Sequence, residues 1–210
     1  MGAGPTRSTR GLGMATIVLF WVTTAIGGLL MFMLINRKTV VNDFFDDASF
    51  GSISKIDDAD NAVAGALTFL YVGIIASVIL SCVWSIRAAG NAKARRPDLN
   101  VSPGLAGGSW FIPLGNYVVP FMQLRRAAAA IGGSLTALVF WQVGFIAWNV
   151  SFGVIASSGS AINDAKSLDD ALGAIDRQVV FGVLMFVAMI VASIFAMQSI
   201  RKFDQLGEAR

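Results

Sequence analysis

The sequence alternates between long apolar stretches and short polar segments. Four stretches contain no Asp, Glu, Lys or Arg, and they cover about residues 12–35, 62–86, 133–155 and 179–200. Each is long enough to cross a bilayer, which needs about 20 consecutive apolar residues. The pattern predicts an all-α integral membrane protein, a four-helix bundle with short tails at 1–11 and 201–210. We expect the first span to be an uncleaved anchor, because its apolar run is longer than the core of a signal peptide.

A fifth apolar stretch, residues 109–124, is too short to span a membrane in the same way. As a helix it would cover about 24 Å, less than the hydrocarbon core of about 30 Å. It also contains Pro113, which can begin a helix, and Pro120, which would kink that helix and free the carbonyl of Asn116. We therefore expect a short Pro-kinked interfacial or re-entrant helix between spans two and three.

The charged residues predict the orientation of the four spans. With both termini on the cytoplasmic side, that side carries 11 basic and 3 acidic residues, a net charge of +8. The opposite side then carries 5 basic and 10 acidic residues, a net charge of −5. Counting 109–124 as a fifth span would divide the basic residues evenly, against the usual excess of Lys and Arg inside. The outer segments are then 36–61 and 157–177, expected as a loop and as a partly helical loop in which Ser167 caps a helix.

The composition excludes several classes of function. Hydrophobic residues make up 55% of the chain and charged residues only 14%, against about 25% charged in soluble domains. The chain has no histidine and one cysteine, so it offers no imidazole base or ligand and no intrachain disulfide. No catalytic or nucleotide-binding motif is present. We expect a protein that is not an enzyme and has no cofactor or metal site. Nucleic acid is not expected as a partner, because the basic residues lie next to the membrane ends.

Small residues recur at helical spacing in two of the predicted spans. Because lipid is as apolar as leucine, helices in membranes associate through close packing of such residues. We expect helix contacts at Gly73, Ser77, Ser81 and Ser85 in the second span and at Ala188, Ala192 and Ala196 in the fourth. The serine stripe could instead line a polar pathway, although no ionisable residue accompanies it.

Tryptophan and amide side chains at membrane depth are a further feature. Trp21 and Trp141 are predicted well inside their spans, where they could pack against each other or line a lipid or quinone cleft. Gln142 and Asn149 are expected to form hydrogen bonds across helices.

The segment from Trp84 to Arg126 carries the most specific pattern of the sequence. It contains SPG-x4-SWFIP-x2-N-x3-P-x4-R, in which Trp110, Pro113, Asn116, Pro120 and Arg125 are fixed points. This pattern resembles the signature of a bacterial family known as domain of unknown function 4328, which has four predicted helices with the signature between the second and third. The other matching positions are Trp84, Arg87, Asn91, Pro103, Gly104 and Phe111. Family members often carry a tryptophan soon after the last arginine, where this chain has four alanines. The resemblance implies no activity.

Two readings of the signature segment remain open. It could be a rigid plug that locks the helix ends, or a docking or lipid-headgroup site. The candidate residues of that site are Trp84, Arg87, Trp110, Phe111, Pro113, Asn116, Pro120, Arg125 and Arg126. We expect a non-catalytic accessory or interaction subunit in the bacterial inner membrane, with lipids and another membrane protein, or a second copy, as partners. The alternatives are a lipid- or small-molecule-binding component of a transport system and a sensor that uses the acidic outer segments.

Overall fold

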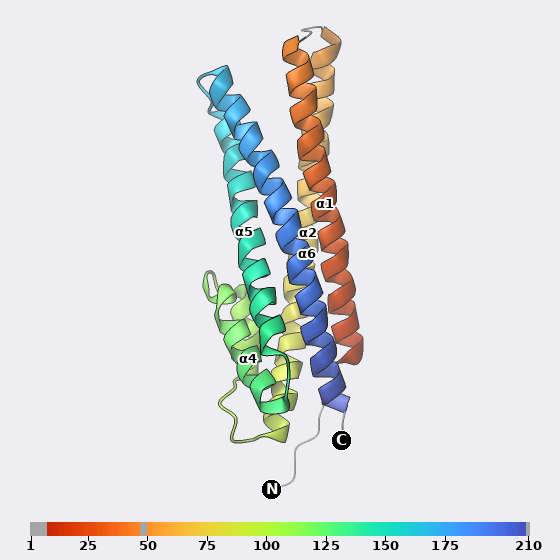
Figure 1. Ribbon diagram of the computed structural model, residues 1–210, viewed down its shortest axis with the longest axis vertical. Helices are drawn as coiled ribbons and strands as arrows, with labels where there is room; N and C mark the ends of the chain where they lie inside the picture. The colour runs from red at the N-terminus through yellow and green to blue at the C-terminus, as the bar shows by residue number, and fades with distance from the viewer. Residues whose placement is uncertain (1–7, 47–49, 209–210) are drawn as a thin grey trace. The chain divides into compact units, whose positions relative to one another are not determined.

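The computed structural model describes residues 8–46 and 50–208, and within them it contains helices and no strands (Figure 1). Four long helices are α1 (Arg10–Asp46), α2 (Phe50–Arg95), α5 (Leu135–Asn163) and α6 (Leu168–Glu208). Between α2 and α5 lie the short helices α3 (Pro103–Gly108) and α4 (Val119–Ile131) and the 3-10 turns η1 (Ser109–Phe111) and η2 (Gly115–Tyr117). All four long helices are long and apolar enough to cross a membrane. The chain is therefore an all-α, multi-pass membrane protein.

The long helices continue well beyond their apolar stretches. The 46 residues of α2 correspond to about 69 Å of helix, more than twice the hydrocarbon thickness of about 30 Å. This corrects the expected loop at 36–61, since α1 continues to Asp46 and α2 begins at Phe50. Hydropathy marks where lipid contact ends, whereas charged residues such as Lys and Asp can stay helical in water. At the other outer segment, Ser167 Oγ accepts the Asp170 amide at 3.2 Å and caps α6, as the sequence predicts.

The chain forms two compact units, each built from parts of the long helices. One unit comprises Thr23–Gly73 and Ala147–Met189. Its helices approach closely at glycines: a Cβ on Gly73 would meet Thr23 Oγ1 of α1 at 2.9 Å, and one on Gly28 would meet the ring of Phe186 of α6 at 2.8 Å. The Tyr71 and Phe152 rings, 5.0 Å apart, join α2 to α5 in the same unit. Small residues on one helix thus make room for large side chains of the next.

The other unit comprises Met1–Val22, Ile74–Ile146 and Ile190–Arg210. In it the last turns of α6 hold the ends of two other helices. The Thr9 hydroxyl donates to Asp204 at 2.5 Å, which brings the carboxylate to the start of α1, where the helix dipole favours negative charge. The Arg95 guanidinium donates to the Leu206 carbonyl, one of the last carbonyls of α6, which no further helical turn can satisfy. Hydrogen bonds therefore connect the end of α6 to the start of α1 and to the end of α2.

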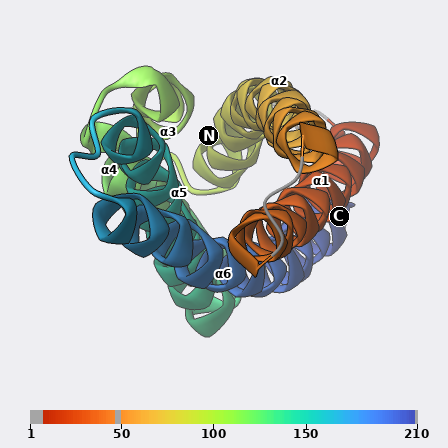
Figure 2. The ribbon, with the colours of Figure 1, turned by 90° about the horizontal axis from the view of Figure 1, so that it is seen from above.

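The same unit contains a compact hairpin, residues 103–131, which flanks the first half of α5 (Figures 1 and 2). The expected single kinked helix is instead two helical arms, α3 and α4, joined by a turn. Pro120 lies in the first turn of α4, where its missing N–H costs nothing, so it begins a helix rather than bending one. Pro113 lies in the turn and begins no helix. The hairpin ends at Gly132, whose φ of 79° closes α4 in the left-handed conformation that glycine tolerates.

Candidate docking site

An aromatic cluster joins the hairpin to α2 and α5, and we call this cluster the aromatic base. Within the hairpin, Trp110 comes from η1 and Phe121 from α4, while Trp84 comes from α2 and Trp141 and Phe145 from α5. The ring of Trp110 lies 5.5 Å from Phe121, 6.2 Å from Trp141 and 5.4 Å from Phe145, mostly edge to face. Trp84 reaches Trp141 at 6.0 Å. Aromatic pairs of this kind each add about 0.5–1.5 kcal/mol beyond the area they bury, so the hairpin is anchored firmly.

The α3 arm lies directly on α2. A Cβ on Gly107 would meet the Cys82 carbonyl oxygen at 2.7 Å, so no larger residue fits at this crossing. One turn further along, the Trp110 indole N–H donates to the hydroxyl of Ser85 at 3.1 Å, and both side chains are buried. These two contacts fix the position and rotation of the first arm.

The turn of the hairpin reaches deep along α5. The Gln142 side-chain amide donates to the Tyr117 carbonyl at 2.7 Å, and its oxygen accepts from Arg125 of α4. Gln142 lies seven positions after the first residue of α5, which corresponds to about 10 Å along the helix. The ring of Tyr117 lies 5.8 Å from Phe145, one turn further. The turn of the hairpin is thus bonded directly to α5, and Gln142 forms the predicted bonds across helices.

The tip of the hairpin is strained and apolar. The Gly115 amide donates to the Pro113 carbonyl at 2.7 Å, which closes a three-residue γ-turn around Leu114. Leu114 has φ 61° and ψ −34°, the only positive φ of a non-glycine residue in the described chain. A γ-turn with positive φ is rare and strained. The Leu114 side chain is 77% exposed, beside the exposed side chains of Phe111, Ile112 and Val118.

Two polar atoms beneath the tip have no hydrogen-bond partner within the described part of the chain. They are Oδ1 of Asn116 and Nε of Arg125, both buried. A buried polar group without a hydrogen bond costs about 1–3 kcal/mol, and a charged group costs more. One acceptor and one charged donor are thus left over in the hairpin.

The predicted site residues lie in different environments. Trp84, Trp110 and Pro120 are buried, and the two tryptophans belong to the aromatic base. Phe111 and Pro113 are exposed near the tip. Asn116 and Arg125 are half-buried below it, whereas Arg126 is exposed and donates to the Asn100 carbonyl at 3.4 Å. Arg87 is exposed on α2 and is not brought into the aromatic base. The segment thus combines a packed aromatic base with an exposed tip.

The small-residue stripes lie inside the units. The buried members are Ser77, Ser81, Ser85, Ala188, Ala192 and Ala196, while Gly73 faces Thr23. Trp21, expected to pack against Trp141 or to line a cleft, is 37% exposed, and its neighbour Phe20 makes the ring contact with Trp141 at 5.8 Å. Sequence reasoning also missed Leu114, because a leucine gives no sign of a positive φ. Phe145 could have been found, because it follows Trp141 by four residues and so lies on the same face of one helix.

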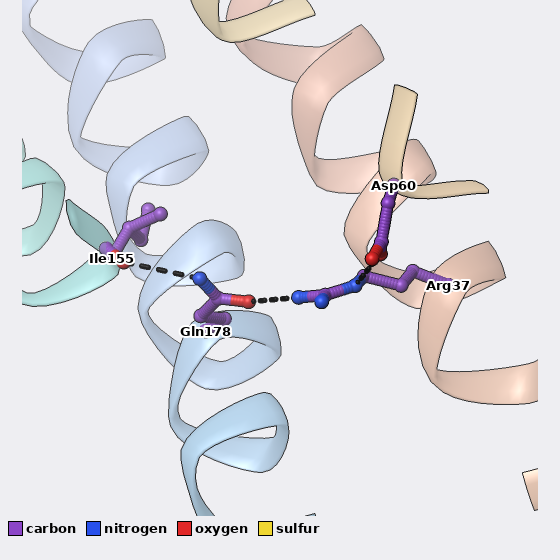
Figure 3. A network of polar contacts seen from close by, with 4 residues as sticks. All are labelled: Arg37, Asp60, Ile155 and Gln178. Carbon is purple, nitrogen blue, oxygen red and sulfur yellow. Dashed lines mark hydrogen bonds and ion pairs between the residues drawn. The ribbon is translucent and has the colours of Figure 1, made fainter. Parts of the chain in front are cut away.

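A second polar cluster lies in the other unit (Figure 3). The Arg37 guanidinium of α1 contacts the Asp60 carboxylate of α2 at 2.5 Å and donates to the Gln178 side chain of α6 at 2.9 Å. Gln178 in turn donates to the Ile155 carbonyl of α5 at 3.2 Å. One chain of contacts therefore ties four helices together. Each of the four residues contacts another member of the cluster, and we call the cluster a structural clamp.

Fold and site together define a class: a four-span helical membrane protein with a helical hairpin between its second and third spans. The family model described as "Domain of unknown function (DUF4328)" matches residues 47–205, and the chain belongs to this family. Searches of curated proteins and of solved structures found no match.

Proposed function

We propose that this protein is a non-catalytic accessory subunit that binds another membrane protein through the tip of its hairpin. The observation that carries the proposal is Leu114, a leucine held at positive φ with its side chain outside the fold. A residue in such a conformation costs about 1–3 kcal/mol, and glycine would relieve most of that cost. Since the side chain gains almost no packing within the chain, its benefit comes from something outside.

A protein partner explains the strained tip better than lipid does. Fluid acyl chains accept any apolar surface and require no particular backbone geometry. A protein surface requires a side chain at a defined place and direction, and the aromatic base holds the tip rigidly enough to supply that. The small-residue stripes cannot serve the partner, because they are already buried within the chain.

The distribution of charge supports an orientation for this complex. Basic residues such as Arg87, Arg95 and Arg126 lie at the end of the spans from which the hairpin enters, the arrangement typical of a cytoplasmic face. We place the protein in the inner membrane of a bacterium with both termini in the cytoplasm. The hairpin then enters from the cytoplasmic side.

Site-specific photo-crosslinking in intact membranes tests the partner. A photoreactive residue at Leu114 is expected to give a discrete heavier adduct with one other protein. The control is the same residue at Leu184, which is 51% exposed on α6 and should give lipid adducts only. Lipid adducts alone at position 114 would sink the proposal, and an adduct of twice the chain's mass would replace it with self-association.

A second variant separates the tip from the fold. Leu114→Gly removes the side chain and accepts the positive φ, so the hairpin should stay folded. A photoreactive residue at Val118 in this variant should lose the partner adduct, whereas Val187→Gly on α6 should leave it intact.

The alternative function, lipid or small-molecule binding in a transport system, is favoured by one observation. Asn116 Oδ1 and Arg125 Nε are an acceptor and a charged donor without partners, and a ligand carrying both kinds of group would satisfy them. Native mass spectrometry of the purified protein is the test. A bound molecule that disappears in Asn116→Leu and Arg125→Ala would favour this function over a protein partner.

A further inference from the structure

A cavity of about 290 Å³ lies between the start of α1 and the end of α6, away from the hairpin. It is lined by Arg10, Met14, Ile17, Arg201, Asp204 and Gln205. All six belong to the same compact unit, although they come from opposite ends of the sequence. The cavity shares no residue with the hairpin tip or with the aromatic base.

Two guanidinium groups give this cavity its positive character. Arg10 lies at the first position of α1, and Arg201 directly follows the last apolar span. Neither arginine lies within ion-pair distance of a carboxylate in the described part of the chain. The carboxylate of the cavity, Asp204, accepts from Thr9 at 2.5 Å and lies against Gly13, where no Cβ would fit. Its charge is thus directed to the start of α1.

An apolar track leads away from the two arginines. Met14 and Val18 follow Arg10 at intervals of four residues, so the three share one face of α1. Both apolar side chains are exposed, and Ile17 beside them is buried. A molecule with an anionic head and an apolar tail would place its head between the arginines and its tail along Met14 and Val18.

We infer that this cavity binds the phosphate of an anionic phospholipid. Basic pockets between membrane helices hold such headgroups, and arginine forms strong charge-assisted hydrogen bonds with phosphate oxygens. A soluble phosphate would use the arginines in the same way. The apolar track distinguishes the lipid, since a free anion gains nothing from Met14 or Val18.

Native mass spectrometry from mixed micelles tests the inference. The intact protein should retain phosphatidylglycerol and not phosphatidylcholine. Arg10→Gln combined with Arg201→Gln should lower retention by roughly tenfold, because both charge-assisted contacts are lost. The control is Arg87→Gln with Lys202→Gln, two exposed residues that remove the same charge at the same end of the molecule without lining the cavity.

Three results would overturn the inference. Equal loss in both double variants would show general attraction between lipid and a basic surface. Unchanged retention in the Arg10 and Arg201 variant would place the lipid elsewhere. Displacement of the lipid by millimolar inorganic phosphate would show a soluble anion site. The Asn116→Leu variant should not change retention here, so this result is separable from the fate of the hairpin.

Discussion

The indole of Trp110 and the hydroxyl of Ser85 form a buried hydrogen bond of 3.1 Å between the hairpin and α2. It is a direct polar link between η1, the turn that follows α3, and a membrane-spanning helix. Four residues earlier on the same face, Ser81 is equally buried, yet its hydroxyl has no partner within the described residues. The two serines are equivalent in the sequence pattern, but only Ser85 accepts a hydrogen bond from the hairpin.

Ser85→Ala should therefore destabilise the protein by about 1–2 kcal/mol, because the indole N–H of Trp110 would stay buried without an acceptor. Ser81→Ala should cost little, since no bond is broken. Thermal unfolding in mild detergent measures both. Equal losses for the two variants would mean that the Trp110 bond contributes nothing.

The crossing of α3 and α2 supplies a second matched pair. Gly107→Ala should destabilise the hairpin by about 1–3 kcal/mol, because the added methyl would meet the Cys82 carbonyl oxygen, a backbone atom that cannot turn away. At Gly108 nothing lies within 4 Å of an added Cβ, so Gly108→Ala should be neutral or slightly stabilising. Limited proteolysis of the 96–102 connection would report release of the hairpin. Equal cleavage rates in both variants would contradict a close contact between α3 and α2 at Gly107.

Arg37 and Lys38 are neighbours on α1, but they should contribute different amounts to the free energy of unfolding. The side chain of Arg37 is 13% exposed and reaches two helices, so Arg37→Gln should cost about 1–3 kcal/mol by leaving Asp60 and Gln178 without their donor. Lys38 pairs with Asp176 at 2.7 Å, but both side chains are largely exposed. Such a pair is worth at most about 1 kcal/mol, so Lys38→Gln should change the unfolding free energy little. A larger loss of unfolding free energy in Lys38→Gln than in Arg37→Gln would argue against the clamp.

The connection between α2 and α3 offers a prediction on pH. The side-chain hydrogen bond from Arg96, helped by a backbone hydrogen bond and by the charge of Arg96, lowers the pKa of Asp98. A carboxyl with a lowered folded-state pKa stabilises the fold above its unfolded pKa, and this contribution is lost as the pH falls through the folded value. Both side chains are exposed, so the effect on stability is small.

The pKa itself is the better measurement. In a carboxyl-carbon NMR titration, Asp98 should titrate below the ordinary range for aspartate, and Arg96→Gln should return it upward. Lys202→Gln, which removes a charge from α6, should leave it where it was. An Asp98 pKa indifferent to Arg96 would show that the ion pair does not persist in solution.

The sequence predicts the four spans well because burial in lipid demands long uncharged stretches, and nothing else in the chain produces them. It predicts the helix ends poorly. Arg37 and Asp60 end the apolar stretches, yet both lie within helices, because a salt bridge lets charged residues stay helical beyond the membrane. A separate short segment between the second and third spans is recognisable from its length and prolines. Its turn is not, because the γ-turn at Leu114 depends on packing of both arms and has no local sequence signal.

The bond between Thr9 and Asp204 joins residues separated by 195 positions. During synthesis the Thr9 hydroxyl therefore has no access to this partner until almost the whole chain has left the ribosome. The same late segment brings the Leu206 carbonyl to Arg95. A nascent chain truncated before α6 would lack both contacts, so this end of the molecule can be completed only when its last helix arrives.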